Sequence, residues 1–407
     1  MTRNIVAGID VGSAYTRVVI CEYSKKDYPP HILAAVRKPT KGMRYGYVID
    51  ATEVGKSIRD TLLEAQKQSG VKLKSAVLGC GGVALGTVIS SGTVAVARAD
   101  AEVTELDVNR AIAASEASVS ERPNIKILHA IPLEFKLDGK KLIGKPIGMN
   151  GGKLEVKSLF ITAASAHVSE LVAATEESGI EVIDVFALPL AESVATLSAL
   201  QKNAGCVLAD IGAETLSIVV FEEGVPISLQ VSKIGSSDIT KDIALGLKIP
   251  LETAEEIKLG KLEENRQISR RVAEIIGARL SDIFENIESH LKKINRNGLL
   301  PAGITLIGGG SEISGIEEAA REYLNLPARK GDNNPENVFA NKAIIRRDTA
   351  EQMKYSGTIE KVRSPEWSAT YGLCLVGLDE TEIESIGITL AKKTRNRFLS
   401  FIKQFLP

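Results

Sequence analysis

Two short segments, 200 residues apart, carry an aspartate, a glycine and a hydroxyl residue in the same order. The first spans residues 10–13 (DVGS) and the second spans residues 210–215 (DIGAET). Glycine lets backbone N–H groups approach phosphate oxygens closely, because no side chain intervenes. A carboxylate repels phosphate but holds Mg²⁺, commonly through waters, and the ion then bridges to phosphate. The two turns therefore indicate phosphate chemistry, with Asp10 and Asp210 as the metal ligands.

A third glycine-rich segment lies near residue 308. Residues 304–307 (ITLI) predict a short strand that runs into GGGS at residues 308–311, and a helical pattern follows at residues 316–324. A strand, a glycine turn and a helix in this order bring backbone close to an adenosine and its α-phosphate. One Asp-x-Gly turn alone is usually an ordinary hairpin turn. Two matched copies followed by this third segment favour a nucleoside triphosphate and its metal, held in a cleft between two lobes.

The elements that must position these turns are predicted from apolar periodicity. Apolar, β-branched runs at residues 5–11 and 17–23 flank the first turn, and the second turn is flanked in the same way. This internal repeat predicts two lobes of related build. Helices are expected at residues 53–69, 105–118, 168–178, 189–200, 266–296 and 316–324, strands at 77–80, 155–162, 182–186 and 304–307, an antiparallel ribbon at 84–97, and irregular loops and strand edges at 330–364. The alternation of strands and helices indicates an α/β protein.

Composition excludes several classes of protein. The chain has 407 residues, with 50 Lys and Arg against 51 Asp and Glu, so no net field would attract nucleic acid, and none is expected as a partner. The four cysteines, Cys21, Cys80, Cys206 and Cys374, form no pair and are expected to be reduced and mostly buried. The four histidines form no ligand motif, which argues against a metal held by imidazole or thiolate.

The chain shows no secretory or membrane-spanning pattern. Its first residues lack an apolar segment of signal-peptide length, and no run approaches 18 apolar residues. We therefore expect a cytoplasmic location unless another segment tethers the chain.

The last 16 residues offer such a tether. Residues 398–406 place apolar side chains at i, i+1, i+3, i+4, i+7 and i+8, on one face of a predicted helix. The apolar residues are Phe398, Leu399, Phe401, Ile402, Phe405 and Leu406, and the cations are Lys392, Lys393, Arg395, Arg397 and Lys403. A basic amphipathic helix of this kind suits an anionic bilayer surface. The alternative is a last helix that packs on the body of the protein.

Several longer strings resemble a known family. They are residues 46–50 (GYVID), 128–135 (LHAIPLEF), 146–149 (PIGM), 154–156 (LEV), 236–247 (SSDITKDIALGL) and 254–258 (AEEIK). Together with the three glycine-rich elements, they resemble the FtsA family of bacterial cell-division proteins, within the actin-like ATPase superfamily. The resemblance runs from about residue 4 to residue 378 and resumes in the tail. It implies an actin-like two-lobed ATPase fold with four subdomains and a C-terminal amphipathic helix.

The resemblance also implies a division of the chain. The nucleotide-binding subdomain of lobe 1 would comprise residues 1–83, 164–196 and 366–378, interrupted by a small inserted subdomain at 84–163 that helps filament contacts. The nucleotide-binding subdomain of lobe 2 would comprise residues 197–235 and 304–365, with a cap subdomain at 236–303. Residues 379–391 would form a linker, and residues 392–407 the membrane-targeting helix.

The family's nucleotide-binding positions carry over residue by residue. They correspond to Asp10, Gly12, Ser13, Arg17, Asp210, Gly212, Thr215, Gly235, Glu255, Lys258, Gly308, Gly309, Gly310 and Ser311. Two positions depart from the family pattern. Arg17 stands where a lysine usually approaches the phosphates, and Ala213-Glu214 replaces two glycines of the second turn. Because a β-carbon and a carboxylate hinder approach to a γ-phosphate, we expect ATP and Mg²⁺ to bind and hydrolysis to be weak at most.

The resemblance implies several partners. FtsA family members bind the acidic C-terminal peptide of FtsZ, a tubulin-like protein, through the cap subdomain. Lys292, Lys293 and Arg296 are candidates for that contact, although cations at a helix end also favour the helix dipole. The chain itself in a filament, an anionic membrane surface and later division proteins would be the other partners.

The expected function is an ATP-binding scaffold that polymerises on the cytoplasmic face of the inner membrane, as a peripheral protein, and tethers FtsZ filaments there. Membrane contact would fall to Arg395, Arg397, Phe398, Phe401, Ile402, Lys403, Phe405 and Leu406. Two alternatives stay open. One is a small-molecule kinase of the same superfamily, for which no catalytic base or acceptor pocket is evident, and the other is a soluble actin-like adaptor of pilus assembly.

Overall fold

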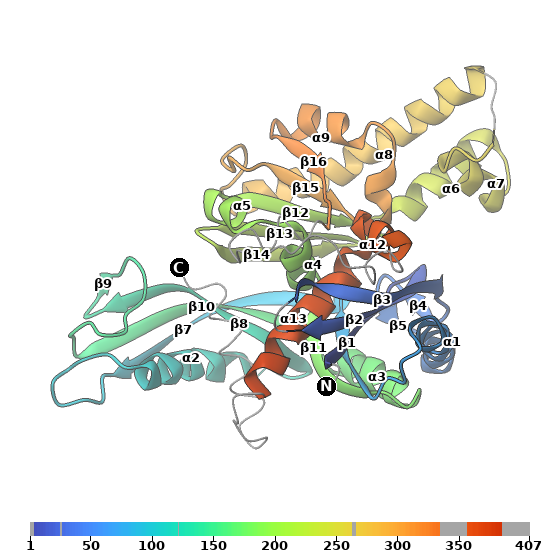
Figure 1. The fold of residues 1–407 in the computed structure, drawn as a ribbon. Coiled ribbons are helices and arrows are strands. Elements are labelled where there is room, and N and C mark those ends of the chain that lie inside the picture. The colour runs from blue at the N-terminus through green and yellow to red at the C-terminus, as the bar shows by residue number, and fades with distance from the viewer. Residues whose placement is uncertain (1–3, 25–26, 121, 263–265, 334–355, 385–407) are drawn as a thin grey trace.

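The computed structural model describes residues 4–24, 27–120, 122–262, 266–333 and 356–384 (Figure 1). Two five-stranded sheets form the centres of two lobes, and a four-stranded sheet extends from the first lobe. The tail with its predicted membrane-binding residues lies outside the described part of the chain. No helix within the described ranges is both long enough and apolar enough to cross a bilayer.

The sheet of the first lobe contains both ends of the first Asp-x-Gly turn. Its strands are β1 (Asn4–Val11), β2 (Tyr15–Ser24), β3 (Asp27–Pro39), β6 (Ser75–Cys80) and β11 (Glu181–Ala187), in the order β11-β6-β1-β2-β3. Strands β1, β2 and β3 form an antiparallel meander, and β6 and β11 run parallel to β1.

The sheet of the second lobe repeats this plan. Its strands are β12 (Cys206–Ile211), β13 (Leu216–Glu222), β14 (Val225–Ser232), β15 (Ile304–Ile307) and β16 (Ala328–Lys330), in the order β14-β13-β12-β15-β16. Again an antiparallel meander is followed by two strands parallel to its first member. The predicted internal repeat is confirmed, and the turn after the first strand occupies the same place in both lobes.

Helices cover both faces of the first sheet. Ile9 and Ile20 pack with Ile58 of α1 (Ala51–Ser69), whereas Val6 and Val19 pack on the other face with Trp367 and Tyr371. Burial on both faces explains why β1 and β2 are continuous apolar runs. The remaining helices of this lobe are α3 (Ser165–Glu176), α4 (Leu188–Thr196) and α13 (Ser368–Glu384), and α13 packs against α4 and β1.

The helices of the second lobe lie above its sheet and beside its two ends in Figure 1. They are α5 (Ala199–Ala204), α6 (Ser236–Leu247), α7 (Leu251–Lys258), α8 (Arg266–Lys293) and α9 (Ile316–Leu324). The long helix α8 buries the face expected from its periodicity, including Leu280, Phe284 and Ile287. It ends at Lys293, earlier than predicted, and Asn295 adopts a left-handed backbone conformation just beyond.

The single helix predicted at residues 189–200 is wrong, because the chain forms α4 and α5 instead. Ser198 caps α5 by accepting a hydrogen bond from the Gln201 N–H (3.3 Å), and the Gln201 side chain accepts one from the Ser198 N–H (3.0 Å). This reciprocal capping box starts a new helix rather than continuing the old one.

The inserted sheet has the order β7-β10-β8-β9 and extends to the left of the sheet of the first lobe in Figure 1. Its strands are β7 (Leu85–Ala95), β8 (Ile125–Leu137), β9 (Lys140–Lys141) and β10 (Lys153–Ala164), and α2 (Glu105–Ser120) packs on β7, β10 and β8. The ribbon expected at residues 84–97 is instead the single strand β7, which pairs with β10, 70 residues away.

Short elements complete the described chain. They are β4 (Met43–Arg44), β5 (Tyr47–Val48), η1 (Gly82–Ala84), η2 (Gly309–Glu312), α12 (Ser356–Arg363) and η3 (Pro365–Trp367). Helix α12 corrects the expectation that residues 330–364 are irregular throughout, and α13 ends at Glu384, inside the range expected for the linker. All four cysteines are free and buried, as expected.

The close packing of α13 on α4 gives a test of the fold. A Cβ atom on Gly372 would lie 2.0 Å from the backbone oxygen of Ala191, whereas one on Gly277 in α8 would meet no atom within 4 Å. Gly372→Ala should therefore lower the free energy of unfolding by about 1–3 kcal/mol through overpacking. Gly277→Ala should raise it by up to about 1 kcal/mol, because alanine favours a helix. Urea denaturation measures both, and equal effects would contradict the described α4–α13 contact.

Candidate functional site

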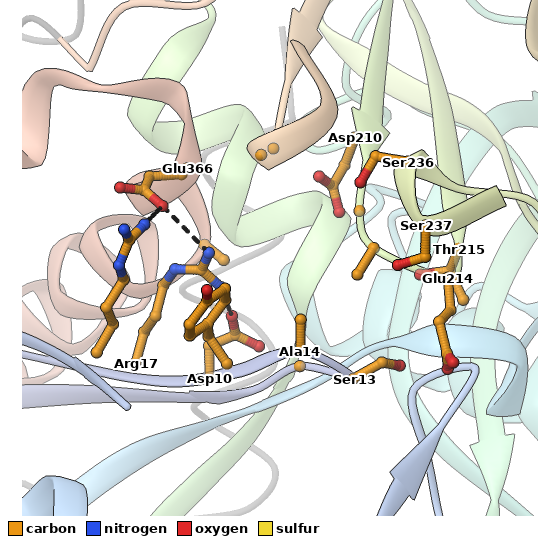
Figure 2. Close-up of a pocket in the computed structure, with 18 of the residues that line it drawn as sticks. Asp10, Ser13, Ala14, Arg17, Asp210, Glu214, Thr215, Ser236, Ser237 and Glu366 are labelled. Carbon is orange, nitrogen blue, oxygen red and sulfur yellow. Dashed lines mark hydrogen bonds and ion pairs between the residues drawn. The ribbon is translucent and has the colours of Figure 1, made fainter. Parts of the chain in front are cut away.

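A cavity of about 840 Å³ lies between the two lobes, and both Asp-x-Gly turns line it. Figure 2 shows Asp10 and Asp210 entering the cavity from different lobes. Eleven of the predicted nucleotide-binding residues line it: Asp10, Gly12, Ser13, Arg17, Asp210, Gly212, Thr215, Glu255, Lys258, Gly308 and Gly309. The fold therefore brings together four segments that are far apart in the sequence, at residues 10–17, 210–215, 255–258 and 308–309.

The two turns are built in the same way. In the first lobe, the Gly12 N–H donates to the Tyr15 carbonyl (3.1 Å), directly after the last pair of the β1–β2 ladder. In the second lobe, the Gly212 N–H donates to the Thr215 carbonyl (2.8 Å) at the equivalent place. Each bond closes a tight four-residue turn, and the aspartate precedes it at the end of the central strand.

Three predicted binding residues, Gly235, Gly310 and Ser311, are not among the residues that line the cavity. A Cβ on Gly235 would lie 2.5 Å from the Ala213 backbone oxygen, and one on Gly310 would lie 2.4 Å from the Ile211 side chain. The Ser311 hydroxyl donates to the Gly308 carbonyl (2.7 Å) and is buried. Gly235 and Gly310 pack where no larger side chain would fit, and Ser311 stabilises the glycine segment. All three therefore support the conformation of the turns.

The electrostatics of the cavity are dominated by carboxylates. Burial raises the pKa of Asp10, although the nearby Arg17 charge lowers it in part. Desolvation, followed by repulsion from Asp10, raises the pKa of Asp210 to about 7, against the opposing effect of Arg17. Burial, then the charges of Asp210 and Asp10, raise the pKa of Glu192 well above its ordinary value. The shifts of Asp210 and Glu192 show that ionising these acids together is unfavourable, whereas the shift of Asp10 comes from its burial.

Glu192 was not found by the sequence patterns. It lies in α4, is 3% exposed and lines the cavity, and its Oε2 atom is buried without a hydrogen-bond partner among the described residues. The available signal was a lone acid in the otherwise uncharged segment 188–197 (LPLAESVATL). A buried, unpaired carboxylate is costly unless a cation or a proton compensates it.

A divalent cation fits this set of groups. Carboxylate oxygens are hard ligands of the kind that Mg²⁺ prefers, and Mg²⁺ usually keeps several waters and binds one or two carboxylates together with phosphate. Asp10 and Asp210 supply two such groups, and no cluster of three or more potential ligands is present in the described chain. The donor set therefore suits an ion that a phosphate chain helps to hold, and such an ion would relieve the repulsion between the acids.

Arg17 lines the cavity as expected, but it is also paired within the protein. Its guanidinium lies 3.8 Å from Asp10 and 3.4 Å from Glu366. Arg37 forms a hydrogen-bonded ion pair with the same Glu366, and both arginines lie over the Tyr15 ring. Arg37 and Glu366 were missed because neither belongs to a recognisable motif. The contact joins β2 and β3 to the segment before α13.

The end of the cavity formed by α6 and α7 is held together by Lys258. Its ammonium donates to the Ser236 carbonyl (3.2 Å) and to the Thr240 hydroxyl (2.9 Å), and it lies 2.7 Å from Glu255. Desolvation acts to raise the pKa of Glu255, but the Lys258 and Thr240 hydrogen bonds and the Lys258 charge lower it overall. Ser237 also lines the cavity here and was not predicted.

The cations predicted to bind a partner lie outside this cavity and are not equivalent. Arg296 forms a bidentate pair with Glu222, with distances of 2.7–3.0 Å, and Lys292 lies 2.8 Å from Glu288. Lys293 lines a separate cavity of about 310 Å³ beside His290 and Gln230. Of the three, Lys293 is therefore the cation that faces a cavity.

The raised pKa of Asp210 predicts a pH dependence of stability. In the unfolded chain this group ionises near 3.8, whereas in the folded protein it keeps its proton up to about 7. The folded protein is therefore favoured below pH 3.8, where Asp210 is protonated. It loses stability as the pH rises from 3.8 towards about 7, because the unfolded chain ionises this group more readily. Asp210→Asn removes this effect, so its thermal midpoint should gain on that of the unsubstituted protein between pH 4 and pH 7. A constant difference across that range, measured without nucleotide, would contradict the assigned repulsion.

Comparisons with known proteins agree with this geometry. A family model described as "Cell division protein FtsA" matches residues 207–372, and one described as "SHS2 domain inserted in FTSA" matches residues 82–162. The cell division protein FtsA of Pseudomonas aeruginosa is 28% identical over 399 residues, which cover 92% of this chain and 90% of that protein.

A second relative and a solved structure complete the comparison. The cell division protein FtsA of Bacillus subtilis is 30% identical over 353 residues, which cover 82% of this chain and 79% of that protein. The structure of the PilM–PilN type IV pilus biogenesis complex is similar in fold, with a TM-score of 0.65 at 20% identity over 92% of this chain and 98% of that chain. The chain thus has the actin-like two-lobed ATPase fold and belongs to the FtsA family of cell division proteins.

Proposed function

We propose that this protein is an ATP-binding scaffold that polymerises on the cytoplasmic face of the inner membrane and tethers FtsZ filaments there during cell division. The observation that carries the proposal is the pair of Asp-x-Gly turns that meet across one cavity of about 840 Å³. Membership of a family of cell division proteins supports the cellular role.

The nucleotide would bind with its phosphates between the two turns. Ser13, Thr215 and the backbone around Gly12 and Gly212 supply the hydrogen-bond donors that phosphate oxygens need. Asp10 and Asp210 would hold Mg²⁺, partly through its waters, and the ion would neutralise charge on both the acids and the phosphates. The chain's own part is to orient the phosphate chain and to bring the two lobes together around it.

The adenosine would lie towards α6, α7 and η2. Glu255 and Lys258 line this end of the cavity, and Gly308 and Gly309 leave room for a ribose and base to approach the backbone. Lys258 is already fixed by three oxygen partners, so it presents an ordered edge to the ligand rather than a mobile charge. Ala213 and Glu214 next to the phosphate positions support at most a weak ATPase.

Asp210→Ala should lower the affinity for Mg·ATP by at least roughly tenfold, since loss of a group that supports a bound metal commonly costs this much. Isothermal titration calorimetry at fixed Mg²⁺ measures the effect. Asp60→Ala removes an exposed acid from α1, far from the cavity lining, and should bind as the unsubstituted protein does. Equal affinities in the two variants would remove Asp210 from the nucleotide site.

The tail supports the membrane part of the proposal by its pattern alone. Its six apolar residues would enter the interface between headgroups and acyl chains, and its five cations would favour acidic lipids. A single short helix binds reversibly, whereas many tails carried by one filament bind firmly, because each attached tail holds its neighbours near the surface. Polymerisation and membrane attachment would therefore reinforce each other.

The FtsZ contact is proposed at the surface around Lys293. Its ammonium is exposed and faces a separate cavity lined by Gln230, Ser289 and His290, where an acidic peptide would find charge and hydrogen-bond partners. Arg296 and Lys292 already neutralise internal acids, so we assign them supporting roles. We infer that the inserted subdomain and the cap contribute filament contacts, and that later division proteins bind the assembled scaffold.

The tether can be tested by reconstitution on anionic vesicles with ATP and FtsZ. The protein should carry FtsZ into the vesicle pellet, and Phe401→Glu with Phe405→Glu should abolish this, because two charges would enter the apolar face. Ser400→Glu with Gln404→Glu adds the same charges to the opposite face of the predicted helix and should retain much more binding.

The same assay separates the two ends of the tether. Lys293→Glu should leave the protein on the vesicles but lose FtsZ from the pellet. Pelleting of the Phe401 and Phe405 double variant at the level of its matched control would reject the tail as the anchor. Recruitment of FtsZ by the Lys293 variant at the usual level would reject the assigned FtsZ surface.

The alternatives are less well supported. The solved pilus complex shares the fold at 20% identity, which is evidence for architecture only, whereas two FtsA relatives match at 28–30% identity over most of the chain. A small-molecule kinase would place a catalytic acid beside an acceptor pocket. We instead assign the acids of this cavity to holding a cation, which would relieve the repulsion between them.

A further inference from the structure

A two-residue turn of the first lobe contacts both Asp-x-Gly turns. The Tyr45 N–H donates to Glu214 Oε2 (2.6 Å), and the next N–H, that of Gly46, donates to the Ser13 hydroxyl (2.8 Å). Ser13 belongs to the first Asp-x-Gly turn and Glu214 to the second, and Figure 2 shows their side chains on the same side of the cavity. Adjacent backbone groups thus connect the phosphate-binding turns of the two lobes.

The conformation of this turn depends on those external bonds. Tyr45 and Gly46 join β4 to β5 with φ values of 51° and 69°. Positive φ at both central residues is typical of a tight hairpin turn that favours Asn-Gly, and it is uncommon for a bulky side chain such as tyrosine. Their N–H groups lie outside the two-residue ladder, so Glu214 and Ser13 satisfy groups that would otherwise need water.

A second contact from the other lobe reinforces the Glu214 bond. The Lys233 ammonium, directly after β14, lies 5.6 Å from the centre of the Tyr45 ring, and Arg44 lies 5.3 Å from it on its own hairpin. The positive charge of Lys233 is attracted to the ring face. Tyr45 is therefore held by a carboxylate at its backbone and by a cation at its ring, both from the second lobe.

The turn that carries Glu214 is itself fixed. The Ser236 N–H donates to the Gly212 carbonyl (2.9 Å), and the Ser237 N–H donates to the Ala213 carbonyl (2.8 Å). A Cβ on Gly235 would lie 2.5 Å from the Ala213 oxygen, so the start of α6 packs directly on this backbone. The Glu214 side chain is thus the part that can move without disturbing the second lobe.

On its other side, the Tyr45–Gly46 turn contacts the root of the inserted sheet. The Val83 N–H donates to the Tyr45 carbonyl (3.1 Å), and a Cβ on Gly46 would lie 2.5 Å from the Cα of Gly82. Residues 82–84 lead directly into β7, the first strand of the inserted sheet. A change at the turn would therefore reach the inserted sheet through backbone contacts alone.

We propose that the hydrogen bond between Glu214 and Tyr45 is an interlobe latch, which opens when the charge of a bound phosphate repels Glu214. The Tyr45–Gly46 turn then transmits this release to the root of the inserted sheet. This inference rests on the proposed binding of nucleotide between the two turns. A phosphate chain there lies beside Glu214, and like charges in a partly desolvated cleft repel strongly. The carboxylate opposes each added phosphate, so Glu214 is also a residue that sets specificity for the number of phosphates.

The charge of Glu214 can be separated from its hydrogen bond. Glu214→Gln keeps an acceptor oxygen for Tyr45 but removes the charge, and Glu214→Ala removes both. In calorimetry with Mg²⁺, Glu214→Gln should bind ATP about fivefold to tenfold more tightly than the unsubstituted protein, with little change for AMP. Glu223→Gln, an exposed acid of the β13–β14 turn, should change neither affinity. Equal gains for ATP and AMP, or none, would overturn the role of charge.

The release itself is measured by hydrogen–deuterium exchange of peptides covering residues 42–50 and 82–90. Without nucleotide, Glu214→Ala should exchange these amides faster than the unsubstituted protein, while Glu214→Gln should stay near it. ATP should raise exchange there in the unsubstituted protein, and AMP should not. If Glu214→Ala exchanges these amides at the rate of the unsubstituted protein, the latch is overturned. If ATP slows exchange in both peptides of the unsubstituted protein, the release by phosphate is overturned.

Failure of the latch and failure of nucleotide binding give different results. If the unsubstituted protein shows no heat with ATP, the proposed function and the phosphate-driven release are both rejected. The nucleotide-free comparison of Glu214→Ala with the unsubstituted protein still decides whether the Glu214–Tyr45 contact holds the turn. If ATP binds normally but Glu214→Ala and the unsubstituted protein exchange at the same rate, the latch is rejected and the proposed nucleotide binding is not.

Discussion

Repulsion between carboxylates at the junction of the two lobes is the constraint on which the rest of this structure depends. Asp10 and Asp210 end the central strands of the two sheets, and Glu192 approaches them from α4 with one oxygen unpaired among the described residues. Burial raises the pKa of all three acids, and repulsion from a neighbouring carboxylate adds to the rise for Asp210 and Glu192. We propose that a cation with a phosphate chain would make all three charges compatible.

The two lobes share one plan, but they do not share one chemistry. Both place an aspartate, a glycine and a hydroxyl residue on a turn after the central strand, and both close the turn with a glycine N–H. The first turn continues with Ser13, whose small side chain accepts a bond from Gly46. The second carries Glu214, which crosses to the first lobe instead. The repeat therefore places Asp10 and Asp210, the metal ligands that we propose, at equivalent positions, while this asymmetry gives the cleft the Glu214 contact for which we propose a response to phosphate charge.

This arrangement suits a protein that acts through the binding contacts of its surfaces. The Tyr45–Gly46 turn contacts Glu214 of the second Asp-x-Gly turn on one side and the root of the inserted sheet on the other. A bound nucleotide would act by changing how the lobes and the inserted sheet are held. That role needs tight and reversible occupation of the cleft more than rapid hydrolysis, and the loss of two glycines from the second turn fits it.

Local sequence by itself determined the strands and helices with strong periodicity, the internal repeat and the three glycine-rich turns that form part of the cavity lining. Asp-x-Gly turns, the glycine run at 308–310 and the buried face of α8 depend on neighbouring residues, so they are visible in the chain. Tertiary structure alone decided the positions of Glu192, Arg37 and Glu366, the indirect roles of Gly235, Gly310 and Ser311, and the partner of Glu214. The break between α4 and α5 depended on one capping box that periodicity obscured. Those features arise from charges and close contacts between residues distant in the chain, and no local pattern records which distant groups will meet.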